Sequence, residues 1–135
     1  MNEMDKRLKY FSRILLGLYI IAVCLLCFMR FNTGIDMSST WFGIPKDKVV
    51  HGLMFFPFPI LMSMAFFRAN GRPLRRIVFL TVCIIIGAIA GGAIELIQQE
   101  TGYRSGDVLD FRADCIGLMT GAVLMLAYAA ILKKW

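Results

Sequence analysis

Acidic residues and the one histidine of this chain gather near the ends of its apolar stretches, where they could take part in chemistry. Asp47, Lys48 and His51 lie within a single helical turn, so Asp47 and His51 share a helix face. The borders of two later apolar stretches carry Glu95, Gln98, Asp107, Asp110 and Asp114. A carboxylate beside a histidine is typical of general acid–base catalysis, although such clusters also occur in structural networks.

Glycines on the same helices predict how these side chains come together. Two helices each carry a G-x-x-x-G pair next to carboxylates: Gly87 and Gly91 before Glu95, and Gly117 and Gly121 after Asp110 and Asp114. Such pairs let membrane helices approach closely. If the two glycine faces pack together, the three carboxylates converge at one end of the seam. The same pairs could instead mediate a homodimer.

The residue types suggest a role for each member of the cluster. The candidate catalytic residues are Glu95, His51, Asp110 and Asp114. The candidate substrate-binding residues are Asp47, Lys48, Gln98, Arg104 and Asp107. Arg104 and Lys48 would hold a phosphate or pyrophosphate, and Asp47 would polarise His51. Capping of a helix start explains Asp107 equally well.

A bound metal is a further interpretation of the same residues. One histidine with several carboxylates is an acceptable ligand set for a divalent cation. Because the spacing selects no particular metal, neither a metal nor another cofactor is assigned.

The elements that position these residues are transmembrane helices. Hydrophobic residues make up 59% of the 135-residue chain, above the roughly 45–50% of a soluble domain. We predict an all-α integral membrane protein, a single domain over residues 1–135. Its four-helix bundle spans approximately residues 12–30, 47–67, 75–98 and 110–132, each near the length that crosses a bilayer. Pro57 and Pro59 should kink the second helix.

Charge distribution predicts the orientation of the bundle. The net charge of +6 comes from short basic clusters between apolar runs, which indicates membrane topology and not nucleic-acid binding. Ten basic residues fall on the side of the termini and five on the other, whereas seven of nine acids fall on that other side. Basic residues favour the cytoplasm, so both termini should be cytoplasmic. The protein would be multi-pass in the cytoplasmic (inner) membrane, with its polar cluster extracytoplasmic. Trp41 and Phe42 would anchor that interface.

Three short segments make the sequence resemble the VanZ-like family of small membrane proteins. They are Asp47-Lys48-Val49-Val50-His51, Glu95-Leu96-Ile97-Gln98, and Arg104-Ser105-Gly106-Asp107 continuing through Asp110 to Gly117 and Gly121. The resemblance implies a bacterial envelope protein linked to tolerance of teicoplanin-type glycopeptides, antibiotics whose target is a lipid-linked cell-wall precursor on the outer leaflet. One position departs from the family pattern: Ala113-Asp114 stands where the family usually has Ala-Asn.

Several functions fit these observations. The leading hypothesis is a protein that binds or modifies an envelope glycolipid or lipid-linked cell-wall precursor at the outer leaflet. A hydrolase or transferase at the same site is the enzymatic version, although the sequence has no nucleophile elbow, P-loop or zinc-protease motif. The alternative is a structural or partner-recruiting membrane protein without catalysis. A small proton-coupled exporter is disfavoured. Such an exporter would need an ionisable residue near the membrane midplane, whereas the acids here lie near the ends of the helices.

Overall fold

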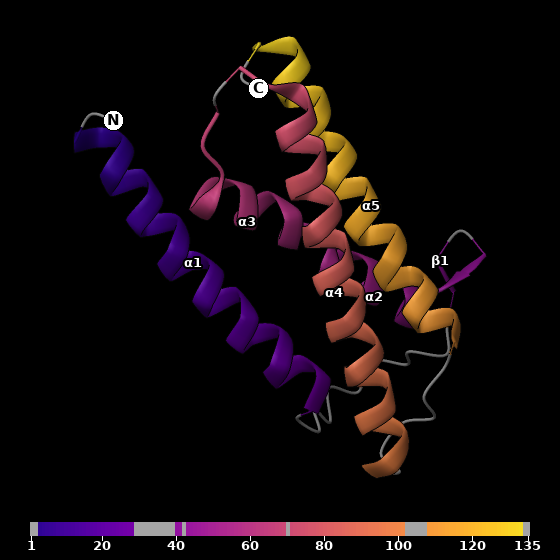
Figure 1. Cartoon of the computed structure of the whole chain (residues 1–135). Coiled ribbons are helices and arrows are strands. Elements are labelled where there is room, and N and C mark those ends of the chain that lie inside the picture. The colour runs from indigo at the N-terminus through magenta and orange to yellow at the C-terminus, as the bar shows by residue number, and fades with distance from the viewer. Residues whose placement is uncertain (1–2, 29–39, 42, 70, 102–107, 134–135) are drawn as a thin grey trace.

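A computed structural model describes residues 3–28, 40–41, 43–69, 71–101 and 108–133. The described chain is almost entirely helical (Figure 1). Its helices are α1 (Glu3–Phe28), α2 (Lys46–Phe55), α3 (Pro57–Phe66), α4 (Pro73–Thr101) and α5 (Val108–Ile131).

The predicted four-span membrane bundle is confirmed. Helices α1, α4 and α5 are each long and apolar enough to cross a membrane, and α2 with α3 forms one further span over Lys46–Phe66. The start of α1, the end of α5 and the α3–α4 connection lie at one end of the bundle (Figure 1). Helices α4 and α5 pack along each other, and α1 packs against α3. Helix α1 begins well before residue 12, because helix-forming residues continue through its basic tail.

The second span is interrupted where prolines were expected to kink it. Helix α2 ends at Phe55 and α3 begins at Pro57. The intervening Phe56 keeps helical dihedral angles, with φ −54° and ψ −43°, and its N–H donates to the carbonyl of Gly52. Pro57 has no N–H to donate to the preceding turn, so the helical ladder breaks there. The break lets α2 and α3 make separate contacts with their neighbours.

Basic residues at the other end of this span hold the last turn of α3. Lys9 donates from Nζ to the carbonyl of Phe67 at 3.2 Å, and Arg13 donates from Nε to that of Ala65 at 3.4 Å. The last carbonyls of a helix have no partner within the helix, so these contacts satisfy them. Buried Arg76 also lies over the Phe67 ring, 4.1 Å from its centroid.

A short hairpin leads into α2. Strands β1 (Thr40–Trp41) and β2 (Ile44–Pro45) pair antiparallel, and Gly43 has a φ of +80°, which favours glycine at this turn. Lys46, the first residue of α2, places its ammonium 5.7 Å from the centroid of the Trp41 ring. Trp41 is exposed, in keeping with an interfacial anchor, whereas Phe42 lies outside the described residues.

The glycine faces do not pack against each other as expected. A Cβ at Gly117 or Gly121 would meet the backbone carbonyls of Gly52 and Phe56, respectively, in the second span. The glycines of α4 instead receive side chains of α5: Gly87 faces Leu118, and Gly91 faces Asp114. Small residues therefore serve two different contacts, α5 against the second span and α4 around side chains of α5. All four glycines are buried within the chain.

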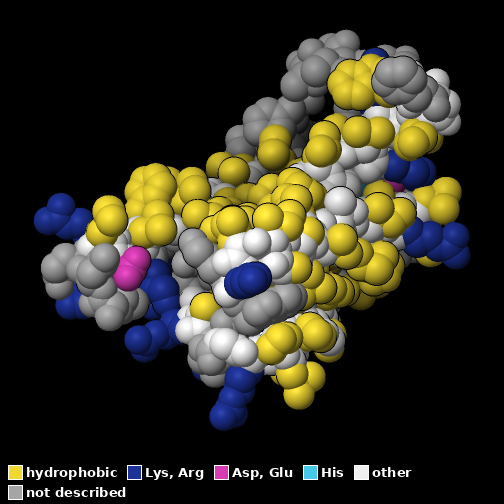
Figure 2. All heavy atoms as spheres, turned by 90° about the horizontal axis from the view of Figure 1, so that it is seen from above, with side chains coloured by type: hydrophobic (Ala, Val, Ile, Leu, Met, Phe, Trp, Pro, Cys, Tyr) yellow, Lys and Arg dark blue, Asp and Glu magenta, His cyan; other side chains and the backbone are white. Residues whose placement is uncertain are grey.

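The outer surface is mostly apolar, as a lipid-facing surface must be. Figure 2 shows hydrophobic side chains over much of the viewed face, with lysine and arginine side chains mostly toward its edges and also near its middle. Exposed side chains include Leu18, Ile89 and Val123, one from each long helix. The polar side chains described next are buried, which is the reverse of a soluble protein.

Candidate functional site

His51 is the centre of a buried polar cluster formed by three helices. Its side chain lies on α2 and is only 2% exposed. The Nδ1 atom is 3.0 Å from Oδ1 of Asp114 on α5 and 3.6 Å from Oε1 of Glu95 on α4. Asp114 is fully buried, and Glu95 is 8% exposed. Glu95 and Asp114 therefore converge as predicted, and both approach the same nitrogen of His51.

A second polar contact, between α2 and α5, lies beside the histidine. The Lys48 ammonium is 2.7 Å from Oδ1 of Asp110. Lys48 precedes His51 by one turn of α2, and Asp110 precedes Asp114 by one turn of α5. The Lys48–Asp110 and His51–Asp114 pairs therefore lie one turn apart along α2 and α5. These two helices run in the same direction, as the second and fourth spans of a bundle must. The Lys48 side chain is 19% exposed, more than the other partners.

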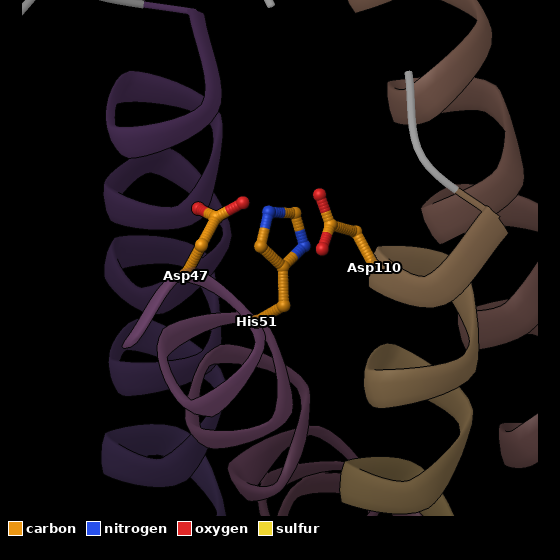
Figure 3. A group of neighbouring side chains, drawn as sticks. All are labelled: Asp47, His51 and Asp110. Carbon is orange, nitrogen blue, oxygen red and sulfur yellow. The ribbon is translucent and has the colours of Figure 1, made fainter. Parts of the chain in front are cut away.

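Asp47 lies on the other side of the imidazole. Figure 3 shows the His51 ring between the carboxylates of Asp47 and Asp110, with one ring nitrogen facing each. Ligand-type atoms of these three residues lie within 4.8 Å of one another. The other contact of the imidazole was not expected: Oδ1 of Asp114 on α5 lies 3.0 Å from Nδ1 of His51. His51 thus has carboxylates of its own helix and of α5 around its ring.

The cluster lies nearer one end of the spans than their middle. With a rise of about 1.5 Å per residue, His51 is roughly 8 Å from the start of α2, and Glu95 and Asp114 are each roughly 9 Å from the described ends of α4 and α5. The three side chains therefore occupy a similar depth, which explains how distant parts of the sequence meet.

Glycines make room for this arrangement. A Cβ at Gly91 would lie 3.0 Å from Oδ2 of Asp114, so a larger residue there would crowd the carboxylate. Gly117 lets α5 approach the backbone of Gly52, the residue after His51. Because Gly91 and Gly117 have no side chains, α2, α4 and α5 can approach one another closely.

A protein-family model described as VanZ/LLP1 matches residues 16–132. The chain belongs to the VanZ/LLP1 family. The match includes the three helices that supply the polar cluster, so the expected resemblance is confirmed. Comparisons with curated proteins and with solved structures gave no match.

The remaining predicted site residues of this VanZ/LLP1 protein have different positions. Gln98 is buried and donates from Nε2 to the Cys27 carbonyl at 2.9 Å, which ties α4 to the end of α1. This contact gives Gln98 a role in helix packing. Arg104 and Asp107 lie outside the described residues.

Tyr19 is a polar residue of α1 that lies near the site and was not among the predicted site residues. Its hydroxyl donates a hydrogen bond to the carbonyl of Met54, one turn after His51. Tyr19 packs against the core formed by α1 and α3. A tyrosine inside an apolar helix indicates a hydrogen bond to another helix, because a buried hydroxyl requires a partner.

Proposed function

We propose that this VanZ/LLP1 protein binds the phosphorylated head group of an envelope glycolipid or lipid-linked cell-wall precursor. Binding would occur at the extracytoplasmic surface of the cytoplasmic membrane and affect tolerance of glycopeptides such as teicoplanin. The observation that carries this proposal is the polar cluster of His51, Glu95 and Asp114, with Lys48 and Asp110 beside it, near one end of three spans.

Burial of this cluster favours function over stability alone. Ionisable residues in membrane spans are costly, and they commonly mark substrate or ion pathways. A buried ion pair adds little net stability, because removing each ion from water costs several kcal/mol. An apolar core would hold three helix ends together at lower cost. The position near one end of the spans also disfavours proton-coupled export through an ionisable residue at the midplane.

Lys48 is the residue best placed to meet a phosphate. Its side chain is the most exposed of the cluster, and its ammonium lies 2.7 Å from Asp110, which positions it. Lysine binds phosphate as a point charge. The hairpin with exposed Trp41 directly precedes α2, and tryptophan commonly sits at the level of lipid head groups.

The side of the membrane is supported by charge. Fewer basic residues lie at the cluster end of the spans than at the end with the termini, with five against ten by sequence. The cluster end should therefore be extracytoplasmic. Accessibility of a cysteine at position 95 to a membrane-impermeant reagent from the cytoplasmic side would contradict this placement.

Binding can be tested in lipid discs that carry labelled undecaprenyl-linked precursors or a panel of envelope glycolipids. Lys48→Gln should weaken binding at least about tenfold, since a hydrogen bond to a charged group contributes about 1.5–3 kcal/mol. Lys46→Gln is the matched control, because it removes the same charge two residues away and outside the cluster. Equal binding by both variants would argue against Lys48 as the phosphate ligand. If the wild-type protein bound none of these lipids, the result would favour a structural, partner-recruiting role.

Chemical modification of the lipid is a second candidate function, favoured by the 3.0 Å contact between His51 and Asp114. A carboxylate that holds an imidazole fixes its tautomer and orientation for proton transfer. Product formation should be followed in the same discs. His51→Ala and Glu95→Gln should abolish turnover, whereas Glu100→Gln, on the exposed part of α4, should not. Binding without any turnover would identify a lipid receptor instead of an enzyme.

A further inference from the structure

We propose that His51, Glu95 and Asp114 bind one divalent transition-metal ion of zinc-like coordination preference. One side chain comes from each of α2, α4 and α5, and the ligand-type atoms lie within 4.8 Å of one another. Imidazole nitrogen and carboxylate oxygen are both ordinary zinc ligands. Three protein ligands leave a fourth position for water or another ligand, as in catalytic zinc sites.

The distances fit coordination by a single ion. Two ligand atoms, each about 2.1 Å from a tetrahedral metal, lie about 3.4 Å apart. The Nδ1 atom of His51 is 3.0 Å from the Asp114 oxygen and 3.6 Å from the Glu95 oxygen. These separations lie on either side of the tetrahedral value, so small side-chain movements would complete the site.

Charge favours the same conclusion. Two carboxylates and one imidazole meet here in the interior of the bundle. Buried charges in proteins are paired or coordinate metals, because an isolated ion in an apolar interior is very unfavourable. A divalent cation would neutralise both carboxylates, with the neutral imidazole as its third ligand.

An oxygen of Asp114 provides an independent observation. Its Oδ1 contacts His51, but the buried Oδ2 makes no hydrogen bond to any residue in the described part of the chain. Buried carboxylate oxygens normally have partners. This oxygen faces Gly91 of α4, where an added Cβ would lie 3.0 Å away. Asp114 thus retains an oxygen that a cation can use.

The neighbouring group of Asp47, His51 and Asp110 is the weaker metal candidate. Asp110 is already paired with the Lys48 ammonium at 2.7 Å, and Asp47 is only half-buried. Asp47 fits a supporting role, because it faces the ring nitrogen of His51 opposite Asp110 in Figure 3. A metal-bound histidine almost always donates its other ring N–H to a carboxylate, a carbonyl or water.

The test uses the full-length protein, purified without a polyhistidine tag, stripped with chelator and titrated with Zn²⁺. Mass spectrometry of elements should then find about one zinc per chain. Glu95→Gln and Asp114→Asn should each weaken binding more than about 10-fold, the lower bound for loss of a supporting residue around a metal. Glu100→Gln makes the same substitution on an exposed part of α4 and should bind zinc as the wild type does.

X-ray absorption of the wild-type zinc protein gives a second measurement that needs no variant. His51 is the one histidine of the chain, so a single imidazole in the spectrum identifies it. Absence of zinc after titration would overturn the proposal, as would sulfur ligands from the cysteines or equal affinity in Glu95→Gln and Glu100→Gln. The proposed metal site does not depend on the lipid ligand. Zinc binding without lipid binding would support the metal site and contradict the proposed function. Lipid binding without zinc binding would refute the metal site and leave the proposed function standing.

Discussion

Replacing Gly117 by alanine should force α2 and α5 apart beside the polar cluster. The added Cβ would collide with the carbonyl of Gly52 and lie 3.1 Å from the backbone nitrogen of Phe56. These obstacles are backbone atoms, which cannot rotate away as a side chain can. Gly52 directly follows His51, and Gly117 is one turn after Asp114, so the displacement falls on the histidine–aspartate contact.

The size of the effect follows from two opposing contributions. Overpacking a tight contact costs about 1–3 kcal/mol, and a backbone obstacle places Gly117→Ala near the upper value. Alanine returns up to about 1 kcal/mol through its helix propensity. The free energy of unfolding should therefore fall by about 2 kcal/mol. Gly17→Ala meets nothing within 4 Å and should be neutral or stabilising by about 0.4–1 kcal/mol.

Gly87→Ala should give an intermediate result. Its Cβ would lie 2.5 Å from a side-chain carbon of Leu118, which can move but is itself fully buried. We expect a loss of about 1 kcal/mol, because rearranging a packed side chain costs less than moving a backbone. Unfolding by SDS in mixed micelles, followed by circular dichroism, measures all three variants. A Gly117→Ala protein as stable as Gly17→Ala would refute the proposed helix contact.

Two further predictions concern polar contacts away from the cluster. Tyr19→Phe should lower the free energy of unfolding by about 1 kcal/mol, because it removes a hydrogen bond to a carbonyl of α2. Tyr10→Phe, at an exposed position of α1, should change nothing, and equal losses in both would count against that hydrogen bond. Arg76→Met should cost about 1–2 kcal/mol through loss of the contact with the Phe67 ring. Arg75→Met, exposed and adjacent, is its control in the same unfolding assay, and a matching loss there would exclude the ring contact as the cause.

The fold was largely predictable because hydropathy and length define membrane spans directly. A segment in lipid must satisfy its backbone internally, so an apolar stretch of sufficient length has to be helical. Proline chemistry likewise located the interruption before Pro57. The early start of α1 was missed, because hydropathy detects the apolar part of a helix and not its charged continuation.

The composition of the site was predictable, but its pairings were not. Polar residues in an apolar helix must face the interior, which led to His51, Glu95 and Asp114. Spacing along one helix predicted Asp47 as a partner of His51, but it could not predict that Asp114 on another helix lies 3.0 Å from the same imidazole.

Residue types along the chain were enough to predict four spans, the break in the second span, the family and the end of the bundle at which polar residues collect. These properties depend on residue type and on periodicity within each segment. Three kinds of contact required the folded structure: those of the glycines, that of Asp114 with His51, and the hydrogen bond from Gln98 to the Cys27 carbonyl. Contacts between helices depend on the rotation and axial shift of each helix. Those quantities arise from packing of all the helices together, and no single segment encodes them.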